Sequence, residues 1–458
     1  MTSPPTSLAT IFKAYDIRGV YPDELDERIA RLVGGAFVRF TGAARVAVGH
    51  DARPSSEPLV AAFLEGATTA GADVVDLGLA STDLVYFASG DLDAPAAMFT
   101  ASHNPPEYNG IKLCRAGAAP VGADTGLHDL EAAVAAGELA AAPRPGRRTH
   151  RDLLPAFVAH VRSFVDVDAL RGQRLVADTA NGLGGLVVPA VFAGLPVDLE
   201  VLYAELDGTF PNHPANPIQP ENLVDLQRAV LERGADAGLA FDGDADRVFL
   251  VDERAEPLSG SLTTTIVAAS ILSRLLPAAT DADRTIVHNL ICSKAVPEVV
   301  RELGGTPVRT RVGHSYIKQV MADTGAGFGG EHSGHYYFRA NYRADSGIIA
   351  ALVVLETLAR SGVPLSELRR PYERYVQSGE RNRRVDDPPA VLERVAAAHA
   401  DAAQDRLDGL TVDHGDWWFN LRPSNTEPLL RLNLEAGDAT SCRRHTDAVL
   451  TVVGGEAD

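Results

Sequence analysis

Three times along the chain, a short apolar strand is followed by a helix, a glycine and a second strand, and this repeat restricts the folds that the chain can adopt. The three copies lie at Arg45–Leu77, Arg174–Leu202 and Thr285–Val312. In the first copy, the strand Arg45–Asp51 leads into a helix over about Ser56–Thr69; in the third, the second strand is expected at Val308–Val312. Two parallel strands need a helical crossover of this kind, so the pattern predicts βαβ units and an α/β fold.

Each copy is followed by an apolar strand that runs into a polar loop. The three loops are Thr100–Pro105, Asp242–Arg247 and Gly330–His335. Loops at the carboxyl ends of strands in open α/β sheets form ligand sites, so three similar domains with one such loop each predict a shared cleft. The Pro- and Ala-rich stretch Ala140–Arg148 is expected to link the first two domains, and beyond about Arg369 the pattern changes to a smaller region of another kind.

Composition excludes several classes of function. A length of 458 residues suits three or four domains, and a net charge of −19 argues against nucleic acid, which needs a basic face. The apolar stretch Leu262–Leu276 is short and interrupted by polar residues, and residues 1–10 lack the apolar core of a signal peptide, so we expect no membrane span and no leader. The three cysteines (Cys114, Cys292, Cys442) are few and far apart, which favours a reducing cytoplasm.

Three aspartates alternate in the second loop. Asp242, Asp244 and Asp246 supply hard oxygen donors that can converge on one divalent cation, most naturally Mg²⁺. A calcium-binding EF-hand is excluded because Arg247 stands where its loop needs glycine, and Val248–Val251 reads as a strand. An acidic surface turn is the alternative without a ligand.

The other polar loops contain groups that suit a phosphorylated sugar. Ser102 follows a strand and could be a nucleophile, although its neighbour His103 does not by itself make a dyad and no G-x-S-x-G elbow surrounds it. Glu331 and Ser333 suit vicinal sugar hydroxyls. A guanidinium, hydroxyls and turn amides that suit phosphate lie together further on: Arg422, Ser424, Asn425 and Thr426.

Some of these residues have a plain structural alternative. His314 and His335 could be acid–base groups or hydrogen-bonded loop histidines. The stretch around Arg422 could equally be a turn between strands. Lysine is rare among the 42 cationic residues, which suggests that a retained lysine is wanted for its compact ammonium. The lysines are Lys13, Lys112, Lys294 and Lys318.

Taken together, the motifs resemble the α-D-phosphohexomutase superfamily, and most closely its bacterial phosphomannomutase/phosphoglucomutase branch. The motifs occur in the family's order across nearly the whole chain: Ala14–Gly19, Thr100–Pro105, Asn109–Lys112, Asp242–Arg247, Gly330–His335 and Arg422–Pro428. The resemblance implies three related α/β domains with mixed sheets between helices, and a smaller C-terminal α+β domain, around one central cleft. The implied domains are 1–149 with the phosphoserine loop, 150–254 with the metal loop, 255–368 with the sugar loop and 369–458 with the phosphate loop.

The resemblance also implies a role for each matching residue. Ser102 would carry the phosphoryl group, and Mg²⁺ would bind Asp242, Asp244, Asp246 and Ser102. The other implied catalytic residues are Arg18, His103, Lys112, Arg247 and His314. The implied substrate-binding residues are Lys294, Glu331, Ser333, His335, Arg422, Ser424, Asn425 and Thr426.

The implied activity is the interconversion of hexose 1-phosphate and hexose 6-phosphate, for mannose and also glucose, through a 1,6-bisphosphate that also serves as activator. A cytoplasmic monomer or homodimer without nucleic-acid or membrane partners is expected. Ala245 and His332 depart slightly from the family pattern without removing a functional group. A phosphoglucosamine mutase is an alternative, although that branch usually carries Gln at position 332 and Gly at position 425. A phosphosugar phosphatase that uses Ser102 is a second alternative, but it needs no clamp for a distal phosphate.

Overall fold

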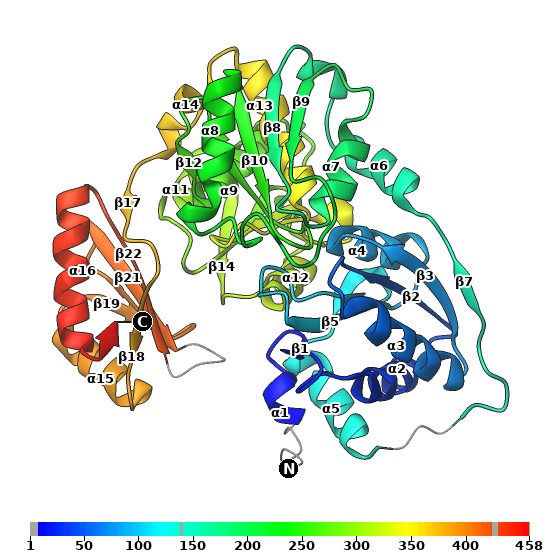
Figure 1. Cartoon of the computed structure of the whole chain (residues 1–458). Coiled ribbons are helices and arrows are strands. Elements are labelled where there is room, and N and C mark those ends of the chain that lie inside the picture. The colour runs from blue at the N-terminus through cyan, green and yellow to red at the C-terminus, as the bar shows by residue number, and fades with distance from the viewer. Residues whose placement is uncertain (1–7, 138–140, 424–428, 458) are drawn as a thin grey trace. The chain divides into compact units, whose positions relative to one another are not determined.

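The chain folds as two units, each built from two separate stretches of sequence. The computed structural model describes residues 8–137, 141–423 and 429–457. The first unit contains residues up to Ser259 together with Ser333–Leu368, and the second contains Gly260–His332 together with the chain from Arg369 onward. Figure 1 shows the elements of both units, coloured along the sequence.

The first unit begins with a mixed sheet in which the first βαβ repeat lies. Its strands are β1 (Ile17–Val20), β2 (Arg45–His50), β3 (Asp73–Leu79), β4 (Ala96–Phe99), β5 (Tyr108–Arg115), β6 (Ala119–Pro120) and β7 (Arg148–His150). The order is β1-β5-β4-β2-β3-β7, with β6 also paired to β5. Strands β2, β3 and β4 are parallel, whereas β5 runs antiparallel to β1 and β4. Strand β4 therefore lies between β5 and β2, and the loop that carries Ser102 follows this interior strand.

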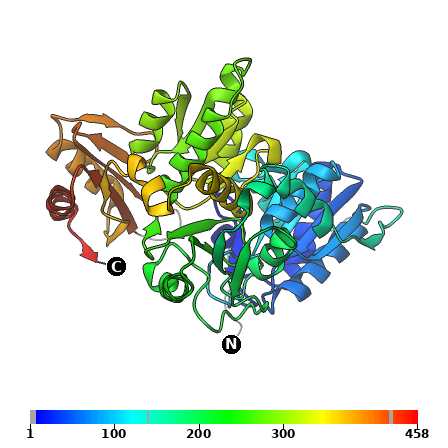
Figure 2. The ribbon, with the colours of Figure 1, turned by 90° about the horizontal axis from the view of Figure 1, so that it is seen from above.

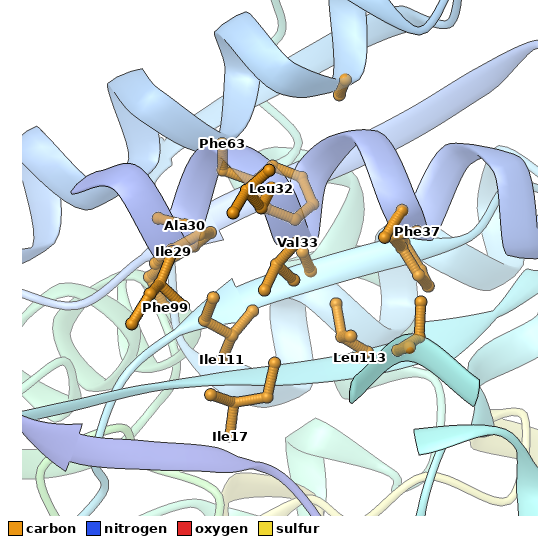
Figure 3. Packing of buried hydrophobic residues seen from close by; sticks show 14 of the residues in the cluster. Ile17, Ile29, Ala30, Leu32, Val33, Phe37, Phe63, Phe99, Ile111 and Leu113 are labelled. Atoms are coloured by element: carbon orange, nitrogen blue, oxygen red, sulfur yellow. The ribbon is translucent and has the colours of Figure 1, made fainter. Parts of the chain in front are cut away.

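Helices cover both faces of this sheet. They are α1 (Leu8–Ile11), α2 (Glu27–Thr41), α3 (Ser56–Thr69), α4 (Thr82–Asp91) and α5 (Leu127–Ala135). Helix α2 starts at Asp26, whose carboxylate caps the N–H of Ile29, and ends where Gly42 adopts a left-handed conformation. Its apolar stripe, which includes Ile29, Val33 and Phe37, lies over the β-strands, as Figure 3 shows.

Two glycines set the close contact between α2 and α3. A Cβ on Gly34 would lie 2.2 Å from the carbonyl oxygen of Phe63, and one on Gly66 would lie 1.9 Å from that of Arg31. The backbones therefore touch only because neither residue has a side chain. On the opposite face of β2, a Cβ on Gly49 would meet Val85 of α4 at 2.6 Å. Helix α4 thus covers the other face of the sheet, and the N–H of its first residue, Thr82, donates to the carbonyl oxygen of Asp244 at 3.0 Å.

A second sheet completes the first unit. Its strands are β8 (Arg174–Asp178), β9 (Asp198–Leu202), β10 (Ala237–Phe241), β11 (Val248–Asp252) and β12 (Pro257–Leu258), in the order β12-β11-β10-β8-β9. The surrounding helices are α6 (Leu154–Arg162), α7 (Gly184–Phe192), α8 (Val224–Arg233), α13 (Gly347–Ser361) and α14 (Leu365–Leu368). The short strand β16 (Tyr336–Phe338) also belongs to the first unit but is not part of this sheet. Strands β10 and β11 form an antiparallel hairpin in which Phe241 pairs with Val248. The three aspartates lie in the turn of this hairpin.

The second unit starts with the third βαβ repeat. Strands β14 (Thr306–Thr310), β13 (Thr285–Asn289) and β15 (Phe328–Gly330) are parallel, with β13 between the other two. Helices α9 (Gly260–Ser273), α10 (Asp281–Arg284), α11 (Ala295–Glu302) and α12 (His314–Thr324) belong to this region. A Cβ on Gly329 would meet Ile317 and Met321 of α12, and one on the next residue, Gly330, would meet Thr264 of α9. Since successive residues of a strand point to opposite faces, α12 and α9 cover opposite faces of β15.

The rest of the second unit is an antiparallel sheet with two helices. The strands are β17 (Val376–Gln377), β18 (Arg381–Arg384), β19 (Ala403–Asp405), β20 (Leu410–Asp413), β21 (Trp417–Pro423), β22 (Leu429–Ala436) and β23 (Glu456–Ala457), in the order β19-β20-β21-β22-β18-β23 with β17 also on β22. Helices α15 (Pro388–Ala398) and α16 (Ala439–Val453) share one apolar core with the sheet. Figure 2 shows α16 nearly along its axis, beside the strands on which it packs.

The predicted α/β fold is confirmed, and so is the change of pattern after about Arg369. The predicted strands Arg174–Asp178 and Thr285–Asn289 have the bounds of β8 and β13. The strand expected at Val308–Val312 is β14, which begins and ends two residues earlier. The N–H of Val312 donates to the carboxylate of Asp408 at 3.1 Å, so it does not bond to a neighbouring strand. Among the described residues, no single helix is long and apolar enough to cross a membrane. The helices Gly347–Ser361 and Leu365–Tyr372, which meet at a sharp bend, reach the required length and apolar composition only when they are taken together.

Candidate active site

Ser102 lies at the carboxyl end of β4 with its side chain directed at the aspartate loop. Its Oγ donates a hydrogen bond of 2.7 Å to Oδ2 of Asp242, which is 140 residues away in sequence. The residue is 1% exposed and has a φ of 52°, a left-handed conformation that costs free energy for serine. The N–H of Ser102 donates to Oγ1 of Thr100 at 2.9 Å, which holds the turn. The two loops that the sequence singled out therefore meet.

The three aspartates form one buried cluster. Each of Asp242, Asp244 and Asp246 is at most 1% exposed, and their carboxylate oxygens lie within 4.8 Å of one another. Lys112, on β5, places its Nζ 2.7 Å from Oδ2 of Asp244 and 2.7 Å from Oδ2 of Asp246. Ser102, Lys112 and the three aspartates therefore lie together in the first unit.

The electrostatics of the cluster fit a cation. Burial, together with the charges of Asp244 and Asp246, raises the pKa of Asp242 well above its ordinary value. Burial also opposes ionisation of Asp244 and Asp246, but the ammonium of Lys112 outweighs it and lowers the pKa of both. Burial would lower the pKa of Lys112 too, and the same two carboxylates raise it instead.

Two carboxylate oxygens of this cluster, Oδ1 of Asp244 and Oδ1 of Asp246, lack a hydrogen bond among the described residues. Both atoms are buried, whereas Oδ2 of each residue is occupied by Lys112. A buried carboxylate oxygen in this state is costly unless a cation or donor satisfies it. The all-oxygen donor set and these two oxygens fit a hard divalent cation such as Mg²⁺.

Arg247 fixes the roles of Ser102 and His103. Its Nη2 lies 3.1 Å from Oγ of Ser102 and 2.7 Å from Nδ1 of His103. A guanidinium only donates, so Nδ1 of His103 accepts and the imidazole is neutral. Burial, and then the charges of Arg247 and Arg18, hold the pKa of His103 well below its ordinary value. In this arrangement the proton of the Ser102 hydroxyl is directed to Asp242.

Arg18 contacts the serine loop, and His335 contacts the aspartate cluster. Arg18, on β1, contacts Asp16 at 2.5 Å and Oδ1 of Asn104, in the serine loop, at 2.6 Å. His335 places its Nε2 3.6 Å from Oδ1 of Asp246, while its Nδ1 is 2.9 Å from Oγ of Ser333. The structure therefore places Arg18 at the serine loop and His335, with Ser333 beside it, at the aspartate cluster.

Glu331 and His314 lie at the carboxyl ends of strands in the second unit. Oε1 of Glu331 accepts hydrogen bonds of 3.1 Å from the N–H of Gly313 and from Nδ2 of Asn289. His314 is the first residue of α12 and follows Gly313. These bonds fix the Glu331 carboxylate beside the start of α12. Lys294 is held elsewhere in this unit, where its Nζ contacts Asp413 at 2.6 Å and the carbonyl of Gly415 at 2.9 Å.

Arg422 lies near the end of β21, just before the predicted phosphate loop. It pairs in register with Arg431 of β22, and Glu380 lies 3.8 Å from Arg422 and 3.7 Å from Arg431. Residues paired across an antiparallel ladder share a face of the sheet, so the guanidinium groups of Arg422 and Arg431 lie on one face. Ser424, Asn425 and Thr426 lie outside the described residues.

Sequence reasoning missed three residues that the structure places at these loops. Thr82 donates to Asp244, Arg53 donates to the backbone of the serine loop, and Arg431 accompanies Arg422. For Arg431, the alternation of β22 around Leu430 and Leu432 is a signal that could have placed it on the face of Arg422. Thr82 and Arg53 lie in ordinary helix-start and loop segments, and nothing local marks them.

Comparison with known proteins agrees with this arrangement. Models of the phosphoglucomutase/phosphomannomutase family match the chain in four parts: alpha/beta/alpha domain I at residues 9–140, domain II at 155–256, domain III at 260–375 and the C-terminal domain at 380–451.

Individual relatives are similar over nearly their whole length. A phosphomannomutase of Salmonella montevideo is 40% identical over 456 residues, which covers 97% of this chain and 99% of the relative. A protein of Xanthomonas campestris described as phosphohexose mutases is 40% identical over 450 residues, with the same coverage. The crystal structure of a phosphoglucomutase/phosphomannomutase family protein from Burkholderia thailandensis has a TM-score of 0.87 and 32% identity, and it covers 98% of this chain and 99% of its own.

The confirmed resemblance makes the chain an enzyme of the isomerase class, an intramolecular phosphotransferase. It belongs to the phosphoglucomutase/phosphomannomutase family of phosphohexomutases.

Proposed function

We propose that this enzyme interconverts the 1- and 6-phosphates of mannose, and also of glucose, through a phosphoserine at Ser102 and a hexose 1,6-bisphosphate. The observation that carries the proposal is the hydroxyl of Ser102 directed at Asp242 inside the aspartate cluster. A nucleophile needs a group that takes its proton and cations that stabilise the transferred phosphoryl group. Asp242 and Arg247 contact the serine hydroxyl, and Lys112 adds a positive charge beside Asp244 and Asp246 of the same cluster.

In the first step, the bond between phosphorus and Oγ of Ser102 breaks as a bond between phosphorus and the free sugar hydroxyl forms. The sugar hydroxyl loses its proton, and Oγ of Ser102 regains one. Arg247 then donates to Oγ, and Oγ donates to Asp242, which is the arrangement that the structure describes. The return step reverses these bonds with the other phosphate of the bisphosphate, so the net reaction moves the phosphoryl group between O1 and O6.

The metal site is part of the proposal. Asp242, Asp244, Asp246 and Ser102 would hold Mg²⁺, which supplies positive charge that stabilises the transferred phosphoryl group. Lys112 pairs with two of the three carboxylates, Asp244 and Asp246, and balances one negative charge. This leaves one oxygen of Asp244 buried and without a hydrogen bond among the described residues, as a metal ligand requires.

The remaining predicted residues would hold the sugar and the phosphate that does not react. We assign Glu331 and Ser333 to sugar hydroxyls, with Lys294, His314 and His335 lining the site. Arg422, Ser424, Asn425 and Thr426 would bind the distal phosphate, with the domains divided at 1–149, 150–254, 255–368 and 369–458. Added hexose 1,6-bisphosphate would activate the enzyme by phosphorylating Ser102.

We further propose a cytoplasmic enzyme that acts as a monomer or homodimer on small phosphosugars. All three cysteines are free and buried, which suits a reducing compartment. The formal net charge of −19 disfavours binding of nucleic acid, so phosphate binding requires a local cationic site.

The test is substitution of the nucleophile. Ser102→Ala should abolish mutase activity, while Ser273→Ala, on the exposed surface of α9, should retain it. Intact-mass measurement after incubation with hexose 1,6-bisphosphate should show one added phosphoryl group on the wild type and none on Ser102→Ala. Mutase activity of Ser102→Ala close to wild type would refute the proposal. Steady release of inorganic phosphate without formation of the isomer would instead make the wild type a phosphatase.

A further inference from the structure

Arg53, which lies between β2 and α3, is a fully buried cation that the mechanism above does not use. Its side chain is 0% exposed. The neighbouring Asp51 accepts from Nε of Arg53 at 3.1 Å and from its backbone N–H at 3.0 Å. Ser56 donates to the same carboxylate at 2.6 Å. Asp51 therefore balances the charge of Arg53 on the Nε side of the guanidinium, and both Nη groups can donate to other acceptors.

Both Nη groups donate to the backbone of one loop, the loop that carries Ser102. Nη2 donates to the carbonyls of Ser102 and Asn104, at 2.9 and 2.7 Å. Nη1 donates to the carbonyls of Pro105 and Tyr108, at 2.6 and 3.0 Å. Four carbonyls within seven residues thus converge on one planar guanidinium, whose fork fixes both their distance and their direction.

The loop needs such support because Ser102 has an unfavourable backbone conformation. Its φ of 52° turns the carbonyl of Ser102 towards Arg53 and leaves Oγ facing Asp242. The same carbonyl is packed from the other side by Gly243, where a Cβ would lie 2.4 Å from it. A residue in this conformation persists only when its surroundings fix it. The carbonyl is therefore held between the metal loop and Arg53.

We propose that Arg53 is a positioning residue that keeps the Ser102 loop in the strained conformation required for phosphoryl transfer. It does so by binding four loop carbonyls from behind, and so sets the direction of Oγ towards Asp242. This inference rests on the proposed role of Ser102 as nucleophile. Arg53 itself lies beneath the loop, so its replacement should affect the rate of the chemical step and leave sugar-phosphate binding nearly unchanged. A displacement of about 1 Å at a nucleophile can cost on the order of a hundredfold in rate.

The test is Arg53→Lys, which keeps the charge beside Asp51 but lacks the planar fork. We expect kcat to fall by about tenfold or more, with KM within about twofold of wild type. Hydrogen exchange at the backbone amides of residues 102–108 should become faster. The matched control is Arg162→Lys, since Arg162 also donates to backbone carbonyls, those of Val191 and Ala193, away from the serine loop. That variant should keep the wild-type kcat.

Other results would overturn the inference. A wild-type kcat for Arg53→Lys, or an equal loss of kcat in both lysine variants, would show that Arg53 has no specific role. If Arg53→Lys does not fold, the double variant Asp51→Asn with Arg53→Gln leaves no buried charge unpaired and should show the same loss of kcat with unchanged KM; wild-type kcat there would also refute it. Activity of Ser102→Ala refutes the proposed function instead, so the two failures are distinguishable.

Discussion

Thr82 binds Asp244 through both its side chain and its backbone. Its Oγ1 donates to Oδ2 of the aspartate at 2.5 Å, and its N–H donates to the carbonyl oxygen of the same residue at 3.0 Å. Thr82 is the first residue of α4 and is 0% exposed. Because Oδ2 is occupied in this way, Oδ1 is the oxygen of Asp244 that remains for a metal ion.

This contact predicts that Thr82 tunes metal affinity. Thr82→Val removes the hydroxyl and nearly keeps the volume of the side chain, so Oδ2 of Asp244 loses one of its two donors and keeps only Lys112. The carboxylate is then less firmly oriented, and Mg²⁺ should bind about tenfold more weakly. Thr82→Ser retains the hydroxyl and should restore most of the affinity. Calorimetric titration of the metal-free proteins with Mg²⁺ measures both. Equal affinities for wild type and Thr82→Val would show that the contact does not orient the ligand.

Removal of the metal should stop turnover reversibly. Three carboxylates repel one another without a cation, so chelation should abolish activity and Mg²⁺ should restore it. Asp244→Asn should weaken Mg²⁺ binding and activity together. Asp168→Asn, a replacement on a side chain that is 81% exposed, is the control and should change neither. Full activity in excess chelator, with no metal found by elemental analysis, would contradict the metal assignment.

The parts of the site that could be predicted from the sequence are those in which a few adjacent residues form a recognisable motif. Asp242, Asp244 and Asp246 could be found because three carboxylates alternate in one hairpin turn, and Ser102 because it ends a strand. Arg53 could not be found in this way, since it contacts a loop 49 residues further along the chain.

Long-range contacts explain the other misses. The hydroxyl of Thr82 meets a carboxylate 162 residues away, and a threonine that begins a helix is common without any such role. The order of strands and helices was predictable because periodicity is local. The division of the polar loop at 330–335 between the two units, after His332, depends on the packing of the whole chain, and periodicity carries no sign of it.

The proposed clamp for the distal phosphate should depend on both Arg422 and Arg431. Arg422→Ala removes a charge-assisted contact worth roughly 1.5–3 kcal/mol, so it should weaken hexose monophosphate binding about tenfold or more and increase escape of the bisphosphate. Arg431→Ala should act in the same direction, because Arg431 pairs with Arg422 across the ladder. The measurements are affinity for the monophosphate and bisphosphate released per turnover. Arg406→Ala, an exposed arginine of the same region, should change neither.

Stability of the second unit should depend on pH through His288. Burial lowers the pKa of this histidine to about 4, below the ordinary value of 6.5, even though Nδ1 lies 3.1 Å from the carbonyl of Asn289. The unfolded chain therefore binds the proton more readily, and the folded state loses stability as pH falls below about 6.5 and on towards 4.

Replacement by glutamine isolates this effect from other titrations. Between pH 7.5 and pH 5, the free energy of unfolding of the wild type should fall by about 2 kcal/mol more than that of His288→Gln. Urea unfolding of both proteins at each pH gives the difference. Parallel curves for the two proteins would show that His288 does not carry the proton linkage.

Substrate breadth is the last prediction, and it follows from the two orientations that a bisphosphate must adopt. The 3- and 4-hydroxyls roughly exchange places when the 1- and 6-phosphates are swapped, so a carboxylate and hydroxyl pair such as Glu331 and Ser333 can bind them either way round. The 2-hydroxyl, which alone distinguishes mannose from glucose, lies in different places in the two orientations. A site that reads a hydroxyl can reject an analogue by about 10⁴-fold or more, whereas an unread position costs far less.

Mannose and glucose phosphates should therefore both be turned over, with kcat/KM values within roughly a hundredfold of each other, and galactose phosphate, inverted at C4, should be a poor substrate. Glu331→Gln should impair mannose and glucose alike, because the bonds from Gly313 and Asn289 hold this carboxylate in one place for either sugar. Mutase assays with the three sugar 1-phosphates, each primed with its bisphosphate, measure these ratios. Rapid turnover of mannose 1-phosphate with none of glucose 1-phosphate would mean that C2 is read after all. His332, which is half-buried with Nδ1 at 2.9 Å from Oγ of Ser261, would then be the first residue to replace, since it follows Glu331 in the same loop.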